Sequence, residues 1–312
     1  MLSAPATASS LYTHPKYAAI LLDAGSGEVL YTRQADAPRY PASITKVLTL
    51  YIAFEAIAKG TLTLDTPIFI SKFAAAQHPS KLGLRAGSQI RVADAINVIA
   101  TRSANDIAVA LAEHISGSEA AFAERMTSTA HRLGMASSTF VNATGLPAAR
   151  QLTTARDIAT LSRALVRDYP KFYPVFAQVA VDYEGQAITN HNHLLSTLPG
   201  VDGIKTGFTN AAGFTLAASA AHDGVRLIAV VLGSPTRQAR DDNVTTLLDT
   251  GFEVLTERSR GERVTVAQTL AEPEDLSDGV LQALVETGVG DDSKLALLKA
   301  PLQPAVPAKR NW

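Results

Sequence analysis

Strand-like segments lie near both ends of this chain, and helix-like segments lie between them. Residues 17–23 and 28–31 flank the turn sequence Ala24-Gly25-Ser26-Gly27, while residues 214–220 and 225–232 flank a second turn. Apolar runs separated by such turn residues are typical of β-hairpins. Apolar residues at helical spacing, by contrast, recur in residues 46–59, 92–101, 106–115, 119–133, 155–166 and 240–255.

This order of elements predicts the fold class. Strands that do not alternate with helices argue against βαβ units and a parallel sheet. We therefore predict an α+β fold, in which the first and last hairpins join one antiparallel sheet and the helices form a lobe against it. The 312 residues, 46% of them hydrophobic, are enough for one large core and a small appendage.

Composition excludes several classes of function. The formal net charge is −1, and no run of Lys and Arg is long enough for a basic arm, so we expect no nucleic-acid partner. The chain has no cysteine, which excludes disulfides, thiolate metal sites and cysteine catalysis. No apolar stretch reaches the roughly 18 residues of a membrane span.

The first chemical motif is Ser43-Ile44-Thr45-Lys46, at the start of an apolar helical pattern that ends at Gly60. A serine hydroxyl becomes a strong nucleophile when a neighbouring base takes its proton. Residues three apart on a helix share a face, so Lys46 can reach Ser43. Apolar neighbours predict that this face is buried, which lowers the pKa of Lys46 toward the neutral, basic form.

Two further motifs follow in order, Ser103-Ala104-Asn105 and Lys205-Thr206-Gly207. Each also has an ordinary interpretation. Ser103 and Asn105 could cap the helix that starts near Asp106, and the second motif could belong to a turn beside a strand. The order, separation and context of the three motifs together favour one catalytic set.

The three motifs together resemble those of serine-type D-alanyl-D-alanine carboxypeptidases. These are low-molecular-mass penicillin-binding proteins in the same superfamily as the class A β-lactamases. The similarity extends from about residue 17 to residue 255 and is carried by blocks at residues 41–46, 103–106, 154–157, 201–207, 211–213 and 247–252.

The resemblance implies a serine D,D-carboxypeptidase that removes the terminal D-alanine from peptidoglycan stem peptides and is acylated by β-lactams. Ser43 attacks the carbonyl between the two D-alanines, and Lys46 takes its proton. Lys205 lowers the pKa of Lys46 by like-charge repulsion and attracts the terminal carboxylate. Ser103 relays a proton to the departing amine, and Asn105 holds Lys46 and the substrate amide.

The resemblance also implies substrate-binding residues. Thr206, beside Gly207, is expected to hydrogen-bond the terminal carboxylate, while the backbone N–H groups of Ser43 and Phe208 are expected to bind the oxyanion. Arg240 resembles a family arginine that reads the carboxylate, but it could equally be a surface arginine that caps its helix.

Other functions remain to be weighed. A D,D-endopeptidase that cuts cross-links would use the same residues. A serine β-lactamase would need a deacylating glutamate, and residues 144–152 contain no carboxylate. His191 and His193 could bind a metal, but no third ligand accompanies them, so we expect neither metal nor cofactor. A scaffold without activity is disfavoured by the intact motifs.

The domain organisation follows from the same comparison. We predict an N-terminal extension (residues 1–16), a catalytic domain (residues 17–257) and a tail (residues 258–312) that is a linker or the remnant of a second domain, with a strand at residues 264–267. The tail is too short for the second domain and membrane-anchoring helix of many relatives, so anchoring is not expected. The first ten residues resemble the start of a mature exported chain, which predicts a periplasmic or other extracytoplasmic location after removal of a signal peptide.

Overall fold

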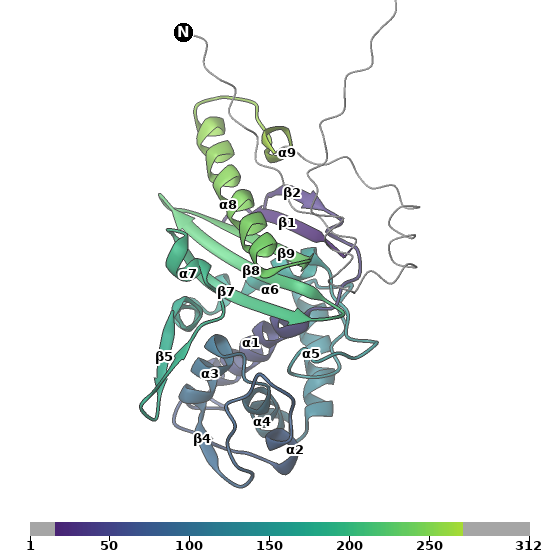
Figure 1. Cartoon of the computed structure of the whole chain (residues 1–312), viewed down its shortest axis with the longest axis vertical. Helices are drawn as coiled ribbons and strands as arrows, with labels where there is room; N and C mark the ends of the chain where they lie inside the picture. The colour runs from purple at the N-terminus through teal and green to yellow at the C-terminus, as the bar shows by residue number, and fades with distance from the viewer. Residues whose placement is uncertain (1–15, 271–312) are drawn as a thin grey trace, which may run out of the picture.

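The computed structural model describes residues 16–270, and its elements follow the predicted order (Figure 1). In chain order they are β1 (Ala18–Asp23), β2 (Val29–Arg33), η1 (Ala42–Ile44), α1 (Thr45–Ala58), β3 (Pro67–Phe69), α2 (Lys72–Ala75), β4 (Gln89–Arg91), α3 (Val92–Thr101), α4 (Asn105–Ser116), α5 (Glu119–Leu133), α6 (Ala155–Asp168), η2 (Tyr173–Ala177), β5 (Ala180–Tyr183), β6 (Gln186–Thr189), α7 (Leu194–Thr197), β7 (Val201–Thr209), β8 (Gly213–His222), β9 (Val225–Ser234), α8 (Arg237–Ser259) and α9 (Val266–Thr269).

One five-stranded sheet joins the two ends of the domain. Its strand order is β2-β1-β9-β8-β7, and every neighbouring pair is antiparallel. The first hairpin meets the last through the pairing of β1 with β9, in which Ala18 lies opposite Leu232. The predicted α+β fold with an antiparallel sheet is therefore confirmed, and β7 forms one edge of the sheet.

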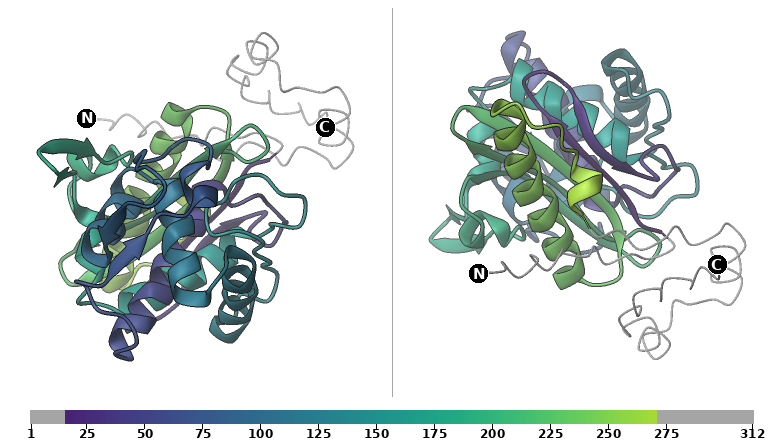
Figure 2. Two further views of the ribbon diagram at one scale, coloured as in Figure 1. Left: turned by 90° about the horizontal axis from the view of Figure 1, so that it is seen from below. Right: turned by 90° about the horizontal axis from the view of Figure 1, so that it is seen from above.

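The sheet is covered on both faces, because alternate residues of its strands point to opposite sides. In β1, Ala18, Ile20 and Leu22 pack into the core shared with the helical lobe, while Ala19 and Leu21 pack into a second core beneath α8. Figure 1 shows α8 on one side of the sheet and the lobe on the other, and the right view of Figure 2 shows α8 lying across the strands. The described residues thus form three layers, in which the sheet lies between α8 and the lobe.

Helix α1 runs through the middle of the lobe. Every residue from 45 to 54 is buried, including Lys46 and Thr49, whereas the sequence pattern predicted burial only for the face that Lys46 shares with Ser43. A helix that packs against neighbours on all sides needs apolar residues all round. The polar residues of this stretch, Thr45, Lys46 and Thr49, therefore lie where water does not reach them.

The structure corrects one predicted element. Residues 264–267 form no strand; instead the short helix α9 begins after Thr265, whose hydroxyl accepts from the N–H of Gln268 in a capping box. The apolar run at these residues is too short to pair with another strand, so the capping box favours a helical turn instead. Val266 and Leu270 are buried in the second core, so packing continues beyond residue 257. The boundary assigned at residue 257 stays a prediction.

The buried end of the described chain gives a stability prediction. Val266→Ala should lower the free energy of unfolding by about 1–3 kcal/mol, because it removes two buried methyl groups and leaves a cavity beneath α8. Urea denaturation followed by circular dichroism would measure this. Ala267→Ser, at the exposed neighbouring position, is the control and should change stability by only a few tenths of a kcal/mol. An equal, small effect of both changes would mean that α9 does not support the fold.

Candidate active site

The third motif packs directly against the first. Strand β7 contacts the 3₁₀ turn η1, and a Cβ atom placed on Gly207 would lie 2.8 Å from the backbone nitrogen of Ser43 and 2.6 Å from Thr215 Oγ1. Any side chain at position 207 would force the strand away from the serine. Glycine therefore allows the strand that carries Lys205 to approach the backbone of Ser43.

Ser43 and Lys46 meet as the spacing predicts. Lys46 Nζ lies 3.1 Å from Ser43 Oγ, within hydrogen-bond distance, and donates to the backbone carbonyl of Thr144 at 2.5 Å. The local backbone differs from the expected helix N-terminus, because Ser43 lies in η1 and α1 starts two residues later. Ala42 has a φ of 47° there, in the left-handed region that L-residues rarely adopt. Tertiary contacts, rather than helix geometry alone, therefore orient the serine.

Lys46 is fully buried, and its pKa is lowered well below its ordinary value. Burial is the largest cause, repulsion by Lys205 adds to it, and the carboxylate of Asp106 opposes both. The predicted combination of burial and like-charge repulsion is confirmed. A lysine with a lowered pKa has a larger neutral fraction near pH 7 and can accept a proton.

Lys205 is also buried, at 1% exposure, and donates to the carbonyl of Thr206 at 3.2 Å. Burial and the nearby cation of Arg240 lower the pKa of Lys205 to about 7. Arg240 is itself only 3% exposed, and its guanidinium donates to Asp241 Oδ1 at 2.6 and 2.9 Å. Because the cap of α8 is Thr236, Arg240 is not the surface capping residue that sequence left as an alternative.

The second motif lies at the turn before α4. Ser103 has a φ of 63°, and nothing within residues 16–270 hydrogen-bonds its buried hydroxyl. The N-cap of α4 is Ala104, so Ser103 does not cap the helix. Asn105 donates through Nδ2 to the carbonyl of His78 at 2.8 Å, and no hydrogen bond joins it to Lys46 among the described residues.

Comparison with known proteins agrees with this geometry. Residues 5–236 match the family of D-alanyl-D-alanine carboxypeptidases within the serine peptidases. The chain belongs to this family. It is 38% identical to D-alanyl-D-alanine carboxypeptidase DacC of Escherichia coli over 75% of this chain and 60% of that protein.

Solved structures of family members have the same fold. Penicillin binding protein 5 of Haemophilus influenzae is 34% identical with a TM-score of 0.73, over 76% of this chain and 70% of that one. Penicillin-binding protein D2 of Listeria monocytogenes, solved with bound cefotaxime, is 31% identical with a TM-score of 0.69, over 75% of this chain and 96% of that one. The chain spans 60 to 64% of the length of the first curated relatives it matches.

Two contributors to the site were missed by sequence reasoning. Asp106 is fully buried, accepts from the N–H groups of Leu82 and Gly83, and its charge acts on Lys46. Its position directly after the second motif is a signal for such a role, but the same position also fits the start of a helix. Thr144 contributes its backbone carbonyl, and no sequence pattern could indicate that contact.

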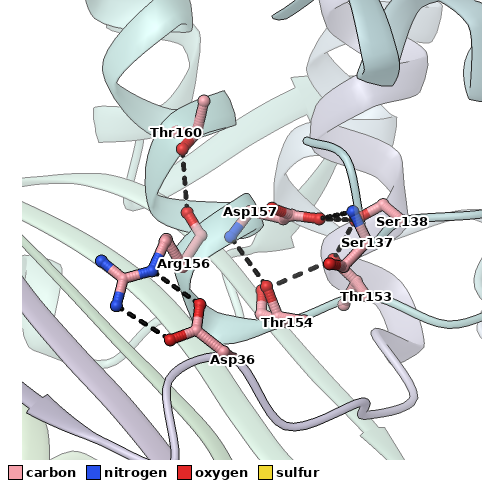
Figure 3. A network of polar contacts seen from close by, with 8 residues as sticks. All are labelled: Asp36, Ser137, Ser138, Thr153, Thr154, Arg156, Asp157 and Thr160. Carbon is pink, nitrogen blue, oxygen red and sulfur yellow. Dashed lines mark hydrogen bonds and ion pairs between the residues drawn. The ribbon is translucent and has the colours of Figure 1, made fainter. Parts of the chain in front are cut away.

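A polar network anchors the segment that carries Thr144 (Figure 3). Asp157 accepts from the hydroxyl of Ser138 at 2.7 Å, and Ser138 is also joined to Thr153 at 2.8 Å. Thr154 caps α6 by accepting from the N–H of Asp157. The block at residues 154–157 that carried part of the family resemblance therefore fixes both ends of the segment between Ser138 and Thr153.

The histidine pair has no further metal ligands around it. Within residues 16–270 no group of three His, Cys, Asp or Glu side chains could hold a metal ion. Partial burial of the His191 ring, together with the nearby cations Lys205, Arg102 and Arg237, lowers its pKa to about 4. It is therefore neutral near pH 7 beside a cationic site. Among the described helices, none is long and apolar enough to cross a membrane.

Burial of Lys205 predicts a cost in stability. Its pKa is about 7 in the folded chain and near 10.5 when unfolded, so the unfolded chain binds more protons between these pH values. Stability of the wild type should therefore rise as pH increases from 7 toward 10.5. Lys205→Met should raise the free energy of unfolding by about 2–5 kcal/mol at pH 7, and this gain should shrink at higher pH.

Urea denaturation near pH 6, pH 7 and pH 9 would test the change. Lys72→Met, at an exposed lysine of α2, is the matched control and should leave stability nearly unchanged. A Lys205→Met protein that is less stable than the wild type at every pH would contradict the predicted penalty.

Proposed function

We propose that this chain is a serine D,D-carboxypeptidase, which removes the terminal D-alanine from peptidoglycan stem peptides through an acyl-enzyme. The observation that carries the proposal is the contact of 3.1 Å between Ser43 Oγ and the Nζ of the fully buried Lys46. A nucleophile within hydrogen-bond reach of a base with a lowered pKa is the arrangement that acyl transfer requires. Membership of the family supports the same substrate class.

In the acylation step, neutral Lys46 takes the hydroxyl proton as Ser43 Oγ bonds to the carbonyl carbon between the two D-alanines. Negative charge then develops on the carbonyl oxygen. The backbone N–H groups of Ser43 and Phe208 are proposed to receive it. The close approach of Gly207 to Ser43 supports this pairing, because Phe208 is the next residue along β7.

The remaining steps use the second motif. As the C–N bond breaks, Ser103 relays a proton to the departing D-alanine nitrogen, and its hydroxyl without a partner in the described chain is suited to that role. Asn105 holds the substrate amide. Water then attacks the ester on Ser43 and releases the shortened peptide.

Recognition of the terminal carboxylate falls to two cations, Lys205 on β7 and Arg240 on α8. Lys205 and Arg240 supply positive charge, and Thr206 supplies a hydroxyl. Both cations are buried, at 1% and 3% exposure, so an anionic substrate group would meet them with little intervening water. The carboxylate would in turn raise the pKa of Lys205 and keep it charged.

Two alternatives use the same residues. A D,D-endopeptidase that cuts cross-links differs in substrate rather than in mechanism, and digestion of cross-linked and uncross-linked muropeptides would separate the two activities. The bound cefotaxime in the Listeria protein supports acylation of Ser43 by β-lactams. Rapid β-lactam hydrolysis is not expected, because residues 144–152 contain no carboxylate.

The proposed substrate also sets the proposed location. Peptidoglycan stem peptides lie outside the cytoplasm, so the chain is proposed to act in the periplasm or another extracytoplasmic space. The proposed partners are stem peptides that end in D-Ala-D-Ala, and β-lactams as covalent inhibitors.

Ser43→Ala should abolish both D-alanine release and covalent labelling by a fluorescent penicillin, because the nucleophile is absent. Gel fluorescence and a D-alanine release assay would measure the two activities. Ser26→Ala, in the turn between β1 and β2, is the control and should keep both. Labelling that persists on another serine of the Ser43→Ala protein would rule out the assignment.

The two lysines should respond differently to arginine. Lys46→Arg should slow acylation by about 10²–10⁴-fold, because a guanidinium keeps its charge and cannot accept the proton. Lys205→Arg keeps the positive charge and should cost only about 1–3 kcal/mol of transition-state stabilisation. Acylation rates with a penicillin would decide, and equal, near-complete loss in both variants would contradict this division of roles.

A further inference from the structure

A tight turn at residues 142–145, here named the Asn142 turn, is fixed against the helix that carries the base. The carbonyl of Thr144 accepts from Lys46 Nζ at 2.5 Å, and the carbonyl of Ala143 accepts from Thr49 Oγ1 at 2.8 Å. A Cβ atom on Gly145 would lie 1.8 Å from the carbonyl oxygen of Ala42. The turn thus contacts α1 at two successive turns and also contacts the backbone just before Ser43.

The centre of the turn is the side-chain oxygen of Asn142. It accepts from the N–H of Gly145 and from Nε2 of Gln151, both at 2.8 Å, and from the N–H and hydroxyl of Thr144 at 3.2 Å. Asn142 Nδ2 donates to the carbonyl of Leu146 at 3.0 Å. A short amide side chain that bonds the backbone two and three residues ahead stabilises such a turn.

Gln151 fixes Asn142 from the other end of the segment. It is 1% exposed, and its Oε1 accepts from the N–H groups of Val141 at 2.9 Å and Asn142 at 3.0 Å. Outside this pair, the hydroxyls of Ser138 and Thr153 close the segment, as Figure 3 shows. The Asn142 turn is therefore held by its own side chains and by the contacts that close the two ends of the segment, although it contains no helix or strand.

The carbonyl of Thr144 has a specific consequence for the amine. A neutral lysine amine has two N–H donors and one lone pair, and the lone pair must face the hydroxyl proton of Ser43 for transfer to occur. An N–H fixed on the Thr144 carbonyl limits rotation about the Cε–Nζ bond and leaves the lone pair free to point at Ser43. If that carbonyl moves, the amine remains basic, but its lone pair is no longer held toward Ser43.

We propose that Asn142 is a positioning residue for acylation: by holding the turn at residues 142–145, its side-chain oxygen fixes the Thr144 carbonyl that orients Lys46 toward Ser43. This inference rests on the proposed function, because it presupposes that Lys46 takes the serine proton. The hydrogen bonds of the Asn142 side chain go to Thr144, Gly145, Leu146 and Gln151, and none of them goes to Ser43 or Lys46.

The test is the pre-steady-state acylation of Asn142→Ala by a chromogenic penicillin. We expect the first-order acylation constant to fall about 10- to 100-fold, as misplaced catalytic groups cause, while the dissociation constant of the initial non-covalent complex stays within about threefold. The fraction of protein that is finally labelled should equal that of the wild type. A purely structural role would instead lower the labelled fraction and leave the rate constant of the folded molecules unchanged.

The matched control is Asn97→Ala. Asn97 lies on α3, and its Oδ1 also accepts from a glutamine Nε2, that of Gln178 at 3.0 Å, so the substitution removes a comparable hydrogen bond away from the Asn142 turn. Its acylation constant should match that of the wild type. Asn142→Asp keeps the accepting oxygen and should recover the acylation constant to within about threefold of the wild type at the pH optimum of each protein.

If Asn142→Ala does not fold, Gln151→Glu provides the test, because it keeps the accepting oxygen of residue 151 but replaces the donor to Asn142 Oδ1 by a second acceptor. Its acylation constant should fall about 3- to 10-fold. An unchanged constant in the folded Asn142→Ala or Gln151→Glu protein, or an Asn142→Asp protein as slow as Asn142→Ala, would overturn the inference. A wild-type protein that no penicillin labels at Ser43 would instead refute the proposed function.

Discussion

The burial of an amine within α1 is the constraint on which the active site depends. An ammonium group transferred from water into a protein interior loses several kcal/mol of hydration, and a lysine there reduces the cost by releasing its proton. Lys46 is buried because α1 packs against other elements on every side through its first ten residues. Basicity at this position is thus a property of the three-layer fold as much as of the motif.

The charged groups around Lys46 have opposite effects on its pKa. Lys205 lowers its pKa further, whereas Asp106 raises it, and the carboxylate of Asp106 is itself held by backbone N–H groups. Ser43 and the Thr144 carbonyl then satisfy the hydrogen bonds of the amine. Two buried lysines in one site reduce the stability of the domain, and the apolar cores on both faces of the sheet offset that loss.

Much of the fold could be predicted because its elements are locally encoded. The periodic apolar residues of α3 and α5 defined both helices at the observed ends, and the two hairpins were indicated by their turns. Within the site, the proximity of Ser43 and Lys46 followed from helical spacing. Where local signals were short, the prediction failed, as with α9, whose capping box at Thr265 outweighed an apolar run of a few residues.

The rest of the site could not be predicted because it depends on backbone atoms and distant pairings. The carbonyl that binds Lys46 is a backbone atom of Thr144, so the side chain at that position does not reveal it. In the same way, an alanine in the sequence does not indicate the left-handed conformation of Ala42. Asp106 was visible as a carboxylate, but its influence on Lys46 depends on how α4 packs beside α1. The contact between Lys46 and Thr144, for example, arises only when residues 98 positions apart come together.

Glycines on two sides of the nucleophile limit how this site can change over time. A Cβ atom on Gly145 would lie 3.0 Å from the backbone nitrogen of Ser43, and one on Gly207 would lie 2.8 Å from it. Replacement at either position would displace the nucleophile itself, so selection for altered ligand preference has little room there. Variation that spares the chemistry is better tolerated at the rim, where the side chain of Phe208 is 51% exposed. Divergence among such proteins should therefore concentrate at that outer edge, next to a serine that stays fixed.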